Sequence, residues 1–111
     1  MAEALITYPF TEEGLRSALE ALGTTANAVA RNLEAMGFKG CREGESNCPV
    51  ANYLLASFPG VREVVVSVGS AFLYRDGQEH VEAPWPFAVD AFVELFDAGR
   101  FPDLEVPDAS S

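Results

Sequence analysis

The stretch Arg62-Glu-Val-Val-Val-Ser-Val-Gly-Ser-Ala-Phe-Leu-Tyr-Arg-Asp-Gly-Gln-Glu-His-Val-Glu82 decides the fold class of this chain. It holds three runs rich in β-branched and aromatic residues, separated by Gly69-Ser70 and by Asp76-Gly77. Such runs are typical of strands, Asp-Gly is a strong hairpin signal, and Gly-Ser suits a type II′ turn. The stretch therefore predicts a three-stranded antiparallel meander with strands over Arg62–Val68, Ala71–Arg75 and Gln78–Glu82.

Helices are predicted before and after the meander in the sequence, because apolar residues recur there at helical spacing. The first begins at the N-cap Thr11 and stops at Gly23, and the second runs from Thr24 or Thr25 to about Met36. The third begins at Asn47 or Cys48 and ends at Pro59-Gly60, and the fourth runs from Pro86 to about Ala98-Gly99.

These elements predict one α+β domain over residues 1–111: a helical pair, a third helix, the meander and a C-terminal helix. The tail is expected to fray from about residue 103, and residues Ala4–Tyr8 are a candidate edge strand. Three helices followed by a hairpin also permit a winged-helix-like topology.

The charge balance bears on the class of partner. The chain of 111 residues has a net charge of −10. From position 63 onward it has ten acidic residues and only two basic ones, Arg75 and Arg100. Such a surface repels nucleic acid and anionic membranes, so no nucleic acid and no membrane is expected as a partner. The acidity is explained either by solubility or by a basic protein partner.

The beginning of the chain lacks a basic segment followed by an apolar run, and no apolar stretch approaches the roughly 20 residues of a membrane helix. Cys41 and Cys48 are too few for a disulfide framework. We therefore expect a cytoplasmic protein with reduced thiols.

Cys48 is the candidate for nucleophilic or redox chemistry. It begins the segment Cys48-Pro-Val-Ala-Asn-Tyr-Leu54, where a helix dipole can favour the thiolate, and Cys41 could serve as a resolving thiol. His80 is the one histidine available as a base. The alternative is that Cys48 is a small buried residue with a structural role, as free cysteines often are.

Metal, cofactor and DNA sites have weaker support. Cys41, Cys48 and His80 do not follow the spacing of a zinc finger, so we expect no metal, and no motif indicates a cofactor. In a winged-helix arrangement the third helix would lie in the major groove of DNA. It offers Asn52 and Tyr53 for contacts to the bases but has no arginine or lysine.

The segment Cys48-Pro-Val-Ala-Asn-Tyr-Leu54, together with Phe92-Val-Glu-Leu-Phe-Asp-Ala-Gly-Arg-Phe-Pro-Asp-Leu104, resembles short uncharacterised proteins of high-GC bacteria and their phages. The resemblance covers the second half of the chain. It implies no substrate, cofactor or catalytic residue.

The two faces of the meander point to a protein partner. Two-residue turns place Val64, Val66, Val68, Ala71 and Leu73 on one face and Val65, Phe72, Tyr74 and Val81 on the other. Since both faces are apolar, either helices cover both or another chain covers one.

We therefore expect a non-enzymatic interaction or regulatory protein that binds another protein, for which the acidic surface would favour a basic partner, or that forms a homodimer through the meander. The alternatives are a thiol-dependent enzyme or redox sensor that uses Cys48, and a winged-helix-type DNA-associated protein. The predicted binding residues are an acidic line on the last helix and aromatic anchors beside it: Asp90, Glu94, Asp97, Phe72, Tyr74 and Trp85.

Overall fold

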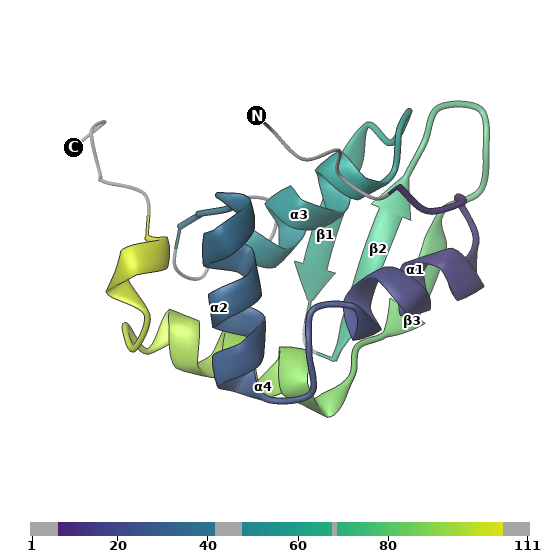
Figure 1. Cartoon of the computed structure of the whole chain (residues 1–111). Coiled ribbons are helices and arrows are strands. Elements are labelled where there is room, and N and C mark those ends of the chain that lie inside the picture. The colour runs from purple at the N-terminus through teal and green to yellow at the C-terminus, as the bar shows by residue number, and fades with distance from the viewer. Residues whose placement is uncertain (1–6, 42–47, 68, 106–111) are drawn as a thin grey trace.

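The computed structural model describes residues 7–41, 48–67 and 69–105. Within them the chain forms four α-helices, a three-stranded antiparallel sheet and a short 3-10 helix (Figure 1). The predicted α+β class is confirmed. The elements in chain order are α1 (Glu12–Glu20), α2 (Ala26–Met36), α3 (Pro49–Ser57), β1 (Glu63–Ser67), β2 (Ser70–Tyr74), β3 (Val81–Pro84), α4 (Phe87–Asp97) and η1 (Pro102–Leu104).

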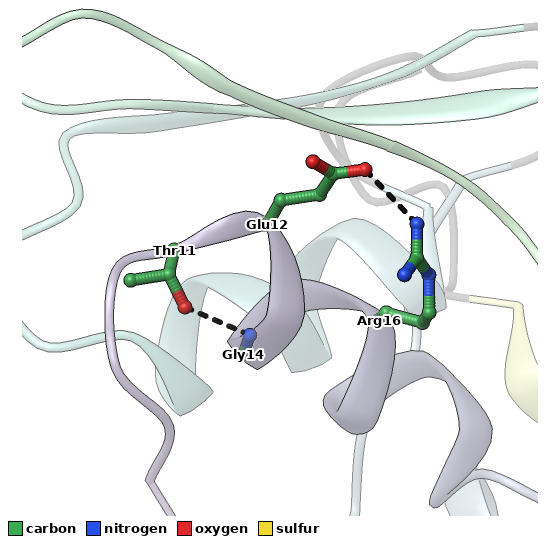
Figure 2. A network of polar contacts seen from close by, with 4 residues as sticks. All are labelled: Thr11, Glu12, Gly14 and Arg16. Atoms are coloured by element: carbon green, nitrogen blue, oxygen red, sulfur yellow. Dashed lines mark hydrogen bonds and ion pairs between the residues drawn. The ribbon is translucent and has the colours of Figure 1, made fainter.

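The helix ends follow local sequence signals. Thr11 caps α1, because its hydroxyl accepts the backbone N–H of Gly14 at 2.9 Å, and the Glu12 carboxylate pairs with Arg16 one turn later at 2.9 Å (Figure 2). Helix α2 ends at Gly37, whose φ of 83° lies in the left-handed region that glycine tolerates. The N–H of Phe38 then donates to the carbonyl of Leu33 at 2.9 Å, which is the hydrogen bond of a Schellman-type helix end.

The first hairpin pairs two residues away from the predicted register. Val66 lies opposite Ala71, and Ser67 lies opposite Ser70, so the predicted turn at Gly69-Ser70 is wrong. Because side chains alternate with a period of two, a shift of two residues leaves every side chain on its predicted face. Val68 lies outside the described residues.

The second hairpin differs by one residue, and this shift changes the faces. Asp76-Gly77 does form a turn, in which the N–H of Gln78 donates to the carbonyl of Arg75 at 3.2 Å. However, β3 begins only at Val81, and Val81 lies opposite Leu73, where a two-residue turn at Asp76-Gly77 would place His80. The predicted placement of Val81 beside Phe72 and Tyr74 is therefore wrong. The observed register puts the apolar valine on the packed face, which is how burial selects strand register.

One face of the sheet is packed against helices. Its buried residues lie on all three strands: Val64, Val66, Ala71, Leu73 and Ala83. Helix α1 contacts β3, α3 contacts β1, and α2 packs against α4. Figure 1 looks onto this side, with α1 in front of the sheet. We call it the inner face, and the opposite side of the sheet the outer face.

The segment after α4 packs back onto the core. Leu104 in η1 is only 2% exposed, and its carbonyl accepts the N–H of Gly40 at 2.9 Å. The prediction that the chain frays from about residue 103 is therefore wrong up to residue 105, because burial of Leu104 anchors η1. Residues 106–111 lie outside the described part.

Two further findings concern the start of the chain and membranes. The candidate strand over Ala4–Tyr8 falls largely outside the described residues, and Tyr8 itself is not in a strand but donates its N–H to the carbonyl of Ser57 at 2.9 Å. In residues 7–41, 48–67 and 69–105 no helix has the length and apolar character to cross a bilayer.

Candidate functional site

Cys48 is built into the start of α3. It is the N-cap residue, and its Sγ accepts the N–H of Ala51 at 3.4 Å, while Pro49 occupies the first helical position. The side chain is 3% exposed. Burial raises the pKa of the Cys48 thiol, the negative charge of Asp97 adds to the rise, and the nearby backbone N–H groups oppose it. The thiol is therefore held in its neutral, poorly nucleophilic form at neutral pH.

The other residues considered for thiol or metal chemistry differ from Cys48 in their exposure to solvent. Cys41 is exposed, and so is His80, which precedes β3. Among the residues that the structure describes, no three histidine, cysteine or acidic side chains are grouped so that they could hold a metal ion.

The outer face of the sheet carries an aromatic cluster formed by Phe72, Tyr74 and His80. The ring of His80 lies 5.9 Å from that of Phe72 and 5.6 Å from that of Tyr74, measured between centroids. Phe72 and Tyr74 are half-buried, as is Val65, which lies opposite Phe72 in β1. The outer face therefore presents partly exposed apolar and aromatic surface, whereas the inner face is packed.

Two exposed carboxylates lie on the edge strands beside this cluster. Glu63 in β1 is directly opposite Tyr74, and Glu82 in β3 is directly opposite Phe72. Directly opposed residues have Cβ atoms about 4.5–5.5 Å apart. A single group of a ligand could therefore contact an aromatic ring and the carboxylate opposite it at the same time.

The structure separates the other predicted binding residues from this cluster. Asp90 and Glu94 are exposed on α4 and Asp97 is half-buried there, with an interaction of its own. Trp85 is only 9% exposed and belongs to the core, so the prediction that it is a surface anchor is wrong. Phe72 and Tyr74 are the predicted anchors that the structure brings together.

Sequence reasoning missed three surface residues. Phe87, at the start of α4, is 84% exposed. The exposure of Phe87 could have been predicted from the sequence. It lies seven residues before Glu94 and hence on the side of α4 opposite the buried stripe. His80 and Glu82 were missed as neighbours of Phe72 because the assumed turn length put the wrong residues of β3 on the outer face.

The residues that the DNA-binding alternative requires are engaged within the fold. The hydroxyl of Tyr53 is buried and donates to the carbonyl of Ala18 at 2.7 Å. The side-chain amide of Asn52 donates to the carbonyl of Lys39 at 2.6 Å. With no arginine or lysine in α3, these contacts leave little for reading base edges.

Comparison with protein-family models, with curated proteins and with solved structures finds no significant match to this chain.

Proposed function

We propose that this chain is a small acidic, non-enzymatic interaction or regulatory protein that binds another protein, or a second copy of itself, through the outer face of its sheet. The observation that carries the proposal is the asymmetry of the sheet. Helices pack on the inner face, while Val65, Phe72 and Tyr74 on the outer face stay partly exposed. Partly exposed aromatic residues on a rigid element are the side chains that most often anchor protein interfaces.

The thiol-based alternative has less support. A thiol-dependent enzyme or redox sensor would use Cys48, but an accessible thiolate is the reactive species, and burial of Cys48 opposes both accessibility and ionisation. No observation of the described residues favours this alternative over protein binding.

The test is capture of a partner by the immobilised full chain from cells of its source. We compare the wild type with a double variant, Phe72→Thr and Tyr74→Thr, in which threonine keeps a high strand propensity while the aromatic surface is removed. The matched control is Phe87→Thr, which removes an aromatic ring that is 84% exposed on α4.

The proposal expects a protein that the wild type and the Phe87→Thr control capture and the double variant does not. Thermal unfolding of all three chains shows whether each is folded in the assay. Equal capture by the folded double variant would contradict the proposal. If the wild type sediments as a homodimer that the double variant lacks, the partner is a second copy, which the proposal includes.

A further inference from the structure

The outer face combines each aromatic ring of β2 with a carboxylate. Tyr74 has Glu63 opposite, and Phe72 has Glu82 opposite. Within the described ranges, neither glutamate has an ion-pair partner. An aromatic face attracts a cation within about 6 Å of its centroid, and a carboxylate strengthens the attraction by a charge-assisted hydrogen bond.

The arginines next to these positions in the sequence have other partners. Arg62 pairs with Asp76 through a 2.9 Å contact, and the guanidinium of Arg75 lies 5.5 Å from the centroid of Phe10. Neither contact involves Glu63 or Glu82. The outer face therefore has two places suited to a cation that neither of these arginines fills. The ring of His80 lies beside both places, 5.9 Å from that of Phe72 and 5.6 Å from that of Tyr74 between centroids.

The spacing of these two places matches an extended chain. Phe72 and Tyr74 are two residues apart on one strand, which corresponds to about 6.6 Å at a rise of about 3.3 Å per residue. An extended partner segment presents its own alternate side chains on one side at the same spacing.

We infer that the outer face binds an extended segment of a partner protein in which lysine or arginine occupies alternate positions. One cation lies over Tyr74 beside Glu63, and the next lies over Phe72 beside Glu82. The inference rests on the proposed function and names the chemistry of the partner. Charge complementarity selects this occupant over a second copy of the chain, because another copy would bring the same two carboxylates and a net charge of −10 to the interface.

The test uses the full chain and a labelled peptide of alternating arginine and threonine, followed by fluorescence anisotropy. One comparison peptide replaces arginine with glutamate. Another places successive arginines three residues apart, which turns them to opposite sides of an extended chain. The protein variants are the pair Glu63→Gln and Glu82→Gln, and a control pair, Glu20→Gln and Glu34→Gln, which makes the same change in net charge at exposed positions of α1 and α2.

The inference expects the wild type and the control pair to bind the alternating peptide. Loss of Glu63 and Glu82 should weaken binding about tenfold, which is about 1.4 kcal/mol. The shifted and glutamate peptides should bind more weakly than the alternating one. Absence of binding by the wild type, equal weakening by both variant pairs, or no preference for the alternating spacing would each overturn it.

The failure of this inference is distinguishable from failure of the proposed function. If partner capture depends on Phe72 and Tyr74 but not on Glu63 and Glu82, the outer face binds a partner of different chemistry, and the inference alone is wrong. If capture is independent of Phe72 and Tyr74, the proposed function is wrong. A homodimer that tightens when Glu63 and Glu82 are neutralised would make a second copy the occupant and overturn the inference.

Discussion

At the scale of single residues, Cys48 illustrates how burial decides the role of a side chain that the sequence leaves open. Its place at the start of a helix would favour a thiolate if the sulfur were exposed. In the fold the side chain is 3% exposed, and desolvation outweighs the hydrogen bonds from the backbone, so the pKa of the thiol is raised. The residue packs in the core and caps α3.

Thiol labelling of the native chain measures this directly. Near neutral pH we expect Cys41 to react quickly because it is exposed, and Cys48 to react slowly because its thiol is buried and protonated. A Cys41→Ser variant should retain only the slow thiol, and denaturant should make that thiol fast. Rapid labelling of Cys48 in the folded Cys41→Ser variant would instead support the thiol-dependent alternative.

Tyr53 is a second residue whose polar group is committed to the fold. Its hydroxyl donates to the carbonyl of Ala18, which links α3 to α1, and burial raises the pKa of the phenol. Tyr53→Phe should lower the free energy of unfolding by about 1–2 kcal/mol, because it leaves the carbonyl of Ala18 without its partner. Chemical denaturation measures the change, and Tyr74→Phe on the outer face is the control expected to cost less. Equal losses in the two variants would contradict this role of Tyr53.

At the scale of elements, features set by neighbouring residues are predicted from the sequence, whereas features set by contacts between distant residues are not. The four helices follow from local signals, such as the cap at Thr11 and the left-handed Gly37, and the structure confirms them. The first two strands are predicted to within one residue at each end, whereas β3 begins three residues later than predicted. The register of the sheet also differs, because Asp76-Gly77 forms its turn without fixing where β3 begins. Register depends on packing of Val81 beside Leu73 against the helices, and a nonlocal contact of this kind has no local signature.

The acidic line on α4 remains a prediction at this scale. Asp90 and Glu94 are exposed, and like charges one turn apart on a helix repel each other by a few tenths of a kcal/mol. If the line steers a basic partner, replacing Asp90, Glu94 and Asp97 together with Asn or Gln should slow association and flatten its salt dependence, with little effect on dissociation. Stopped-flow association with the captured partner measures both. An unchanged association rate would leave these residues as a solvated helix surface.

At the scale of the whole molecule, the sheet divides the chain into a packed side and a partly exposed side. The helices and η1 pack around one core, which includes Trp85 and Leu104. The outer face then becomes the place where aromatic residues and carboxylates meet, although Phe72 and Glu82 come from different strands. The candidate site is thus a product of strand register. This explains why the sequence predicts Val65, Phe72 and Tyr74 on this face but not His80 and Glu82 beside them.

Binding through the outer face is measured most directly by the footprint of the captured partner on the isotope-labelled chain, read from backbone amide chemical shifts. We expect the largest perturbations on Val65, Phe72, Tyr74 and their neighbours in the sheet, with α1 and α3 little changed. Perturbations confined to α4, or centred on Cys48 at the start of α3, would contradict binding through the outer face.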